Sequence, residues 1–145
     1  MANFTRSMNI HKKHKTPIQL RFKDGDALGH VNNANHLTYF ETARIIYFRD
    51  LVGEEIDWKK EGMILARVTV DYKKPIYLTD NIFVYTWFVK SGRTSFELAY
   101  SLVKTNSDGT ETELSVGTSV IVCYNYAEQK PTPVPANWLE KMQNY

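Results

Sequence analysis

The stretch ANHLTYFETARIIYFRDLVG, residues 34–53, decides the fold of this chain. Its apolar residues recur at the spacing of a helix, and it ends on a glycine, which commonly terminates one. The apolar positions are Leu37, Phe40, Ile45, Tyr47, Phe48 and Leu51. The spacing predicts a helix over residues 34–52. Because its apolar residues fall on several sides, we expect protein to surround most of this helix.

Strands are predicted on both sides of the helix, where apolar and polar residues alternate. They cover residues 16–22 and, after the helix, about 64–72, 81–90, 94–104 and 112–124. Gly92 and Gly109 lie in short polar stretches that predict hairpin turns between the later strands. This order predicts an α+β fold in which a curved antiparallel sheet wraps one long central helix. The open edges of such a sheet favour a homodimer that continues it.

The composition is that of an ordinary globular domain. Hydrophobic residues make up 43% of the 145 residues, enough to bury one core, so we expect a single domain over residues 1–145. The 18 basic residues nearly balance the 16 acidic ones, which excludes the strongly cationic surface of a typical nucleic-acid-binding protein. The short basic run HKKHK, residues 11–15, is expected to be a solvated arm. We therefore expect no nucleic-acid partner.

The single cysteine, Cys123, excludes an internal disulfide and any zinc site built from cysteines. It lies in an alternating strand, where a lone cysteine is typically a small buried apolar residue. The N-terminal residues contain no apolar stretch long enough for a signal peptide or a membrane span. We therefore expect a soluble cytoplasmic protein without a membrane partner.

The chemistry concentrates in the stretch RFKDGDALGHVNN, residues 21–33, just ahead of the predicted helix. It carries two carboxylates, Asp24 and Asp26, and it ends where the first N–H groups of the helix lack partners within the helix. Those N–H groups carry partial positive charge and stabilise a developing oxyanion, so a carboxylate and an oxyanion site would face one substrate. Turns and helix caps use the same residue types, and spacing alone favours that interpretation, with the substrate site as the alternative.

Two motifs in this region resemble the signature of the 4-hydroxybenzoyl-CoA thioesterase family of hotdog proteins. The first is Asp-x-Asp-x-x-Gly-His-Val-Asn-Asn at residues 24–33, and the second is Tyr-Phe-Glu-x-Ala-Arg at residues 39–44. Two later family elements follow in order, Asp-Tyr-x-x-Pro at residues 71–75 and Gly-Arg-Thr-Ser-Phe at residues 92–96. The resemblance covers about residues 16–125, the expected core of the domain, and it implies the hotdog fold.

The resemblance also implies an activity, hydrolysis of an acyl-CoA thioester to a free carboxylic acid and CoA without a metal or an organic cofactor. In this family the second aspartate of the first motif, here Asp26, is the catalytic base or nucleophile. Asp24 would then be structural. The backbone N–H of Asn33 would bind the thioester carbonyl oxygen, and His30 would position the loop.

Glu41 is a rival for the role of catalytic acid. A second branch of hotdog thioesterases is similar but carries its catalytic carboxylate on the central helix, at about this position. The intact Asp-x-Asp motif favours Asp26 over Glu41. In that case Glu41 would pair with Arg44, three residues further along the helix.

Binding residues are assigned by the same resemblance. Candidates for the CoA phosphates are Lys73, Lys74, Lys90 and Arg93, with Arg93 the first choice. The family usually binds CoA across a subunit interface, so these residues would serve the partner's Asp26 in a homodimer or homotetramer. An apolar slot for the acyl chain could include Tyr39, Phe40, Tyr47 and Trp87, although such residues are more often part of a core.

Three other functions are compatible with the same fold. One is hydrolysis of an acyl-carrier-protein thioester, and a second is an acyl-CoA-binding module that has lost turnover. The third, a hotdog hydratase, is disfavoured because it uses a differently organised loop and helix. The acyl group itself is not indicated by any motif in the sequence.

Overall fold

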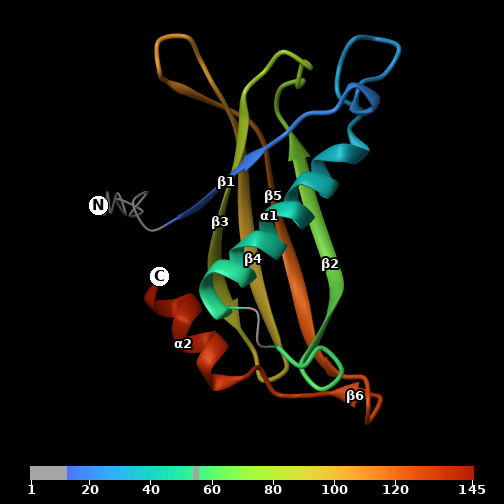
Figure 1. Ribbon diagram of the computed structural model, residues 1–145, viewed down its shortest axis with the longest axis vertical. Helices are drawn as coiled ribbons and strands as arrows, with labels where there is room; N and C mark the ends of the chain where they lie inside the picture. The colour runs from blue at the N-terminus through green and yellow to red at the C-terminus, as the bar shows by residue number, and fades with distance from the viewer. Residues whose placement is uncertain (1–12, 54–55) are drawn as a thin grey trace, which may run out of the picture.

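The computed structural model describes residues 13–53 and 56–145 and consists of a sheet with a long helix laid across it (Figure 1). The helix is α1, Ala34–Val52. The strands are β1 His14–Ile18, β2 Gly62–Tyr72, β3 Ile82–Ser91, β4 Ser95–Thr105, β5 Glu111–Asn125 and the two-residue β6 Lys130–Pro131. A short 3-10 helix, η2 Phe22–Asp24, and a C-terminal helix, α2 Ala136–Asn144, complete the elements. This arrangement confirms the predicted hotdog fold.

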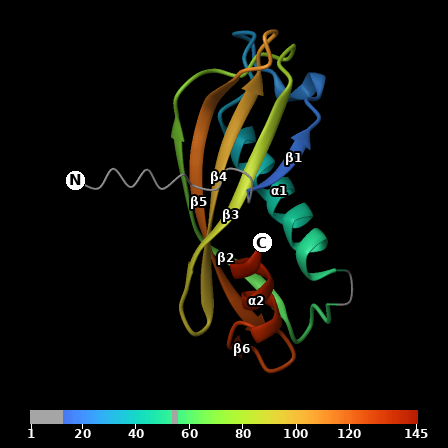
Figure 2. The same cartoon turned by 90° about the vertical axis from the view of Figure 1, so that its left-hand side faces the viewer.

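The sheet is antiparallel throughout, with the strand order β1-β3-β4-β5-β2, and β6 pairs with the end of β5. Seen from the side, it curves around α1 (Figure 2). Strand β2 forms one edge, and β5 is its only partner strand among the described residues. Strand β2 ends at the same end of the molecule as the loop before α1, at the top of Figure 1. Its last residue is Tyr72.

The predicted elements are confirmed, with one shift. The central helix has the predicted bounds, Gly53 follows it with a φ of 90°, and the four later strands lie within two residues of the expected ranges. The first strand ends at Ile18 and does not continue to residue 22. It stops there because β3 begins at Ile82, directly opposite Ile18, so the chain beyond has no pairing partner.

The helix is covered on one side only. Its buried residues are His36, Tyr39, Phe40, Ala43, Tyr47 and Phe48. Ile45, by contrast, is 60% exposed. The expectation that protein surrounds most of the helix is therefore wrong for the single chain, because the sheet covers one face and no other described element covers the opposite one.

A glycine sets how closely the helix approaches the sheet. The ring of Phe40 on α1 stacks on Tyr100 of β4, with ring centroids 4.9 Å apart. A Cβ atom at Gly117 of β5 would lie 2.5 Å from the Phe40 ring and 2.5 Å from the Thr69 carbonyl oxygen. Only a residue without a side chain fits, so Gly117 allows the helix to pack directly on the sheet.

The N-terminal basic run differs from the expectation. His14 is 5% exposed, because β1 pairs with β3, and its Nε2 atom lies 2.8 Å from the carboxylate of Asp50 on α1. The prediction of a solvated arm is therefore wrong for His14, while residues 11 and 12 lie outside the described part of the chain.

The C-terminal helix closes the end of the core beyond α1. Trp138 and Met142 of α2 are buried, and the Trp138 ring meets the Phe48 ring edge-on, 5.7 Å between centroids. Cys123 is fully buried, as predicted from its place in a strand. No helix in the described residues has the length and apolar character needed to cross a membrane.

Candidate active site

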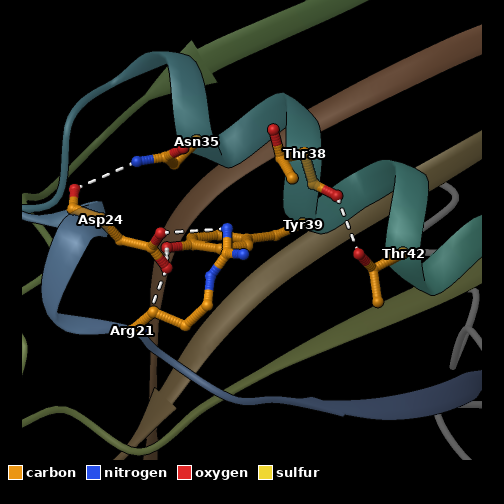
Figure 3. A network of polar contacts seen from close by, with 6 residues as sticks. All are labelled: Arg21, Asp24, Asn35, Thr38, Tyr39 and Thr42. Atoms are coloured by element: carbon orange, nitrogen blue, oxygen red, sulfur yellow. Dashed lines mark hydrogen bonds and ion pairs between the residues drawn. The ribbon is translucent and has the colours of Figure 1, made fainter.

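Asp24 connects the loop before α1 to the helix itself (Figure 3). Its carboxylate is buried and accepts hydrogen bonds from the Tyr39 hydroxyl at 2.9 Å and the Arg21 amide at 3.1 Å, and it pairs with the Arg21 guanidinium at 3.2 Å. Burial alone would raise the pKa of Asp24, but these bonds and the Arg21 charge lower it on balance. The carboxylate is therefore ionised and fully engaged, in agreement with a structural role.

The backbone carbonyl of Asp24 holds the other end of the loop. It accepts hydrogen bonds from the Asn32 amide at 2.9 Å and from the Asn35 side-chain amide at 3.0 Å. The Val31 amide in turn bonds to the Ile76 carbonyl at 2.8 Å. These bonds fix the intervening loop, residues 25–31, at the N-terminal end of α1.

Asp26 lies in this loop and, unlike Asp24, is not buried. One of its carboxylate oxygens, Oδ1, accepts hydrogen bonds from the Leu28 amide at 2.9 Å and the His30 amide at 3.4 Å. The Asp26 amide donates to the His30 carbonyl at 2.7 Å. The other oxygen, Oδ2, has no hydrogen-bond partner among the described residues. The carboxylate is thus held in one orientation through its Oδ1 atom alone.

His30 contributes its backbone to the orientation of Asp26, while its ring makes a separate contact. The ring meets Tyr77 edge-on, with centroids 5.0 Å apart, and the two residues form an isolated β-bridge. These contacts hold His30 against Tyr77, and its role in positioning the loop stays a prediction.

The start of α1 presents a backbone N–H without a partner. The side chain of Asn32 caps the helix by accepting a hydrogen bond from the Ala34 amide at 2.9 Å, whereas the side chain of Asn33 makes no capping bond. Within the described residues, the Asn33 amide has no hydrogen-bond acceptor. This N–H lies at the positive end of the helix dipole and remains available to an oxyanion.

Tyr72 of β2 supports this turn from the sheet. Its hydroxyl donates to the Asn33 carbonyl at 2.9 Å, and its ring meets the ring of His36 edge-on at 4.8 Å between centroids. His36 is buried, its Nδ1 atom lies 2.8 Å from the Ser115 hydroxyl, and burial lowers its pKa to about 4. A neutral histidine and a tyrosine therefore fix the position of Asn33.

Glu41 does not share the loop of Asp26. It lies on the exposed side of α1, two turns beyond Asn33, and its carboxylate is 4.0 Å from the guanidinium of Arg44. This contact confirms the predicted local pair.

The four candidates for CoA binding fall at opposite ends of the chain's sheet. Lys73 and Lys74 follow Tyr72, and Lys73 pairs with Glu113. Lys90 and Arg93 lie at the β3–β4 turn, which is tied to β5 opposite the start of β2. Because β2 rises about 3.3 Å per residue, roughly 30 Å separates the two groups, too far for one site within a single chain.

The four aromatic candidates for an acyl slot are not brought together. Tyr39, Phe40 and Tyr47 are 4%, 1% and 1% exposed and belong to the core. Trp87 lies on the other face of the sheet, beneath the amine of Lys13 at 3.9 Å. Within the single chain, they form no slot for an acyl chain.

The structure adds residues that the sequence analysis did not single out for the site, namely Tyr39 as a partner of Asp24, Tyr72 and His36. Tyr39 and Tyr72 lie within the quoted motifs, so the motifs did contain the signal. Among the described residues, no group of three or more His, Cys, Asp or Glu side chains could hold a metal ion.

A curved sheet around one long helix, with an Asp-x-Asp loop fixed at the start of that helix, is the architecture of a hotdog thioesterase. The family model of the thioesterase-like superfamily matches residues 20–142, and the chain belongs to this superfamily. This confirms the resemblance seen in the motifs.

Individual relatives agree with this membership. The Bacillus subtilis (strain 168) protein named "Putative acyl-CoA thioesterase YneP" is 29% identical over 127 residues, 86% of each chain. The acyl-CoA thioester hydrolase YbgC of Escherichia coli O6:H1 is 23% identical over 121 residues, 82% of this chain and 87% of YbgC. A solved thioesterase from Thermus thermophilus, complexed with coenzyme A and Zn, is 35% identical with a TM-score of 0.75, covering 90% of this chain and 91% of its own.

Proposed function

We propose that the protein hydrolyses acyl-CoA thioesters and that Asp26 is its catalytic carboxylate. The proposal is carried by a fixed, exposed carboxylate in the loop that leads to the helix N-terminus. At that terminus the Asn33 N–H has no acceptor among the described residues. The names of YneP and YbgC and the CoA complex of the Thermus relative support CoA as the thiol component. Glu41 lacks a comparable arrangement, since its only ion-pair partner among the described residues is Arg44 on the same helix.

Two routes use the same groups. As a general base, Asp26 removes a proton from water while the water oxygen attacks the thioester carbon. As a nucleophile, its free oxygen attacks that carbon and forms a mixed anhydride, which water then cleaves. In both, the carbonyl oxygen becomes an oxyanion at the Asn33 N–H, the C–S bond breaks, and the CoA thiolate takes up a proton.

Edge pairing supports a homodimer. Strand β2 leaves one edge open, and exposed backbone N–H and C=O groups on an edge favour pairing with another strand. If two copies joined antiparallel through β2 around a two-fold axis at Arg67, the middle of the strand, Gly62 of one copy would lie opposite the partner's Tyr72. Because Tyr72 holds Asn33, the start of β2 would then complete the partner's site. The same pairing would carry Lys90 and Arg93 toward the partner's Asp26.

The dimer has a direct test in Leu65→Lys, a change at a β2 residue that is 44% exposed. Light scattering should show a dimer for the wild type and a monomer for this variant, together with loss of hydrolysis. Val89→Lys is the matched control, because Val89 is 45% exposed but lies on β3. A wild-type monomer with full activity would contradict the shared site.

The catalytic assignment is tested by release of free CoA thiol from a panel of acyl-CoAs. Asp26→Asn should lower kcat by two or more orders of magnitude with the fold retained. Asp108→Asn is a matched control, because Asp108 also accepts a hydrogen bond from the amide two residues further on, in a turn outside the site. Glu41→Gln should keep most of the activity. Comparable loss in Glu41→Gln and none in Asp26→Asn would transfer the role to Glu41.

The two routes are separated by a single turnover at enzyme excess in water labelled with oxygen-18. The base route places the label in the product acid and leaves Asp26 unlabelled. In the anhydride route, attack of water on the aspartyl carbon labels Asp26, whereas attack on the acyl carbon labels the product as the base route does. Mass spectrometry of the Asp26 peptide after an acid quench covers both directions of attack. It detects the oxygen-18 label on Asp26 in the first case and an acylated Asp26 in the second.

The alternative of a binding module has its own readout. Tight CoA binding without hydrolysis of any thioester, including one on acyl carrier protein, would indicate a protein that binds acyl-CoA and does not turn it over.

A further inference from the structure

A cavity of about 430 Å³ lies between the second half of α1 and the start of β2. Its lining includes Arg44, Ile45, Phe48, Arg49, Trp58 and Met63. A neighbouring cavity of about 270 Å³ shares four of these residues and extends to Leu65 on β2. The size and mainly apolar lining of the larger cavity are those of a site for a small organic ligand.

Two arginines, Arg44 and Arg49, interrupt this apolar lining, and Arg44 is the more buried of them. Its side chain is only 12% exposed, and it lines both cavities. Its guanidinium donates one hydrogen bond, at 3.3 Å, to the hydroxyl of the buried Tyr100. Its other contact is the ion pair with Glu41 at 4.0 Å, and the Glu41 side chain is 61% exposed.

A guanidinium has five N–H donors in a planar fork, and a largely buried one normally has them paired. Arg44 leaves most of its donors without an acceptor among the described residues, and its side chain lines a cavity. Arg49 differs, because its side chain is 56% exposed and lies 3.6 Å from Asp50. Among the described residues, the cavity therefore combines an apolar body with a largely buried guanidinium that has one hydrogen bond and one 4.0 Å ion pair. This combination complements an apolar chain that ends in a carboxylate.

We propose that this cavity receives the acyl chain of the thioester and that Arg44 selects acyl groups with a carboxylate at their far end. This inference rests on the proposed thioesterase function and names its substrate class, the ω-carboxyacyl-CoAs. The carboxylate would form a paired hydrogen bond with the Arg44 fork while the methylene chain contacts Ile45, Trp58 and Met63.

The proposed two-fold pairing of β2 would bring the cavity of one copy close to the thioester site of the other. Within one chain, Arg44 is eleven residues along α1 from Asn33, about 16 Å at 1.5 Å per residue. Met63 and Leu65, which line the cavities, lie at the start of β2, the segment that would face the partner's Tyr72 and Asn33. The cavity of one copy would thus open toward the thioester bound in the other.

The test compares two eight-carbon substrates, octanoyl-CoA and suberyl-CoA, which differ in the terminal carboxylate. For the wild type we expect kcat/KM to be on the order of tenfold or more higher with suberyl-CoA, the size of effect typical of a hydrogen bond to a charged group. Arg44→Met should abolish this preference and leave kcat/KM for octanoyl-CoA within a few-fold of the wild type. Arg49→Met is the matched control and should retain the preference.

Three results would overturn the proposal. One is equal kcat/KM for the two substrates in the wild type, and another is an equal loss of preference in Arg49→Met. The third is an Arg44→Met variant that loses both activities in parallel or that is a monomer by light scattering. Either result would assign Arg44 to the fold or the interface. Failure of the proposed function itself is distinguishable, because neither substrate would then be hydrolysed in an Asp26-dependent manner.

Discussion

The hydroxyl of Tyr39 donates a 2.9 Å hydrogen bond to the buried carboxylate of Asp24, which joins the second turn of α1 to the loop that carries Asp26. This bond fixes the position of the loop relative to the helix N-terminus. The relative position of the Asp26 carboxylate and the Asn33 N–H therefore depends on the bond between Tyr39 and Asp24.

Tyr39→Phe should destabilise the protein by roughly 1–3 kcal/mol, because it leaves a buried carboxylate oxygen short of a partner. Urea unfolding measures this change. Thr42→Ala is the control, since the exposed Thr42 hydroxyl bonds only to the Thr38 carbonyl of its own helix and should contribute within about 0.5 kcal/mol. Equal stability of Tyr39→Phe and the wild type would show that the Asp24 contact does not hold the loop.

Stability should fall as the pH drops from about 6.5 toward 4. The pKa of His36 is lowered by burial to about 4, so between these values the unfolded chain binds a proton that the folded chain does not. The loss approaches roughly 3 kcal/mol at the lower end, at about 1.4 kcal/mol per pH unit. Urea unfolding at several pH values measures it, and His36→Asn should flatten the slope. An unchanged slope in this variant would assign the pH dependence to other groups.

Cys123 should resist thiol reagents in the native protein. Burial, with a smaller contribution from the charge of Glu61, raises the pKa of its thiol to about 11, and the side chain has no exposed surface. An aromatic disulfide reagent at neutral pH should label it only in denaturant, with one thiol per chain. Ser91→Cys adds an exposed thiol and should react at once. Rapid labelling of native wild type would contradict the tight packing around β5.

Gly117→Ala should be strongly destabilising, because the added methyl group would meet both the Phe40 ring and the Thr69 carbonyl at 2.5 Å. We expect a loss of about 2 kcal/mol or more, measured by thermal or urea unfolding. Gly92→Ala offers the control, since its Cβ would have the Ser95 hydroxyl at 3.4 Å as its nearest neighbour. A wild-type stability in Gly117→Ala would mean that α1 can move away from the sheet at little cost.

The sequence predicted most of the fold because local signals agreed with the final packing. Helical spacing and Gly53 set the bounds of α1, and alternation located β2 to β5, since both patterns record which side of an element is buried. The end of β1 was not predictable in this way. It depends on where β3 begins, and strand pairing between distant segments leaves no local mark in either segment.

The motifs by themselves located the candidate site, since residues 24–33 adjoin the helix start in the chain as well as in space. Which aspartate is buried and which is accessible was decided by the tertiary structure, because the Tyr39 hydroxyl reaches Asp24 only when the loop folds onto α1. The same applies to Arg44. Its i+3 pairing with Glu41 follows from helical spacing, but its burial beside an apolar cavity depends on Trp58 and Met63, which the fold brings to α1 from later in the chain.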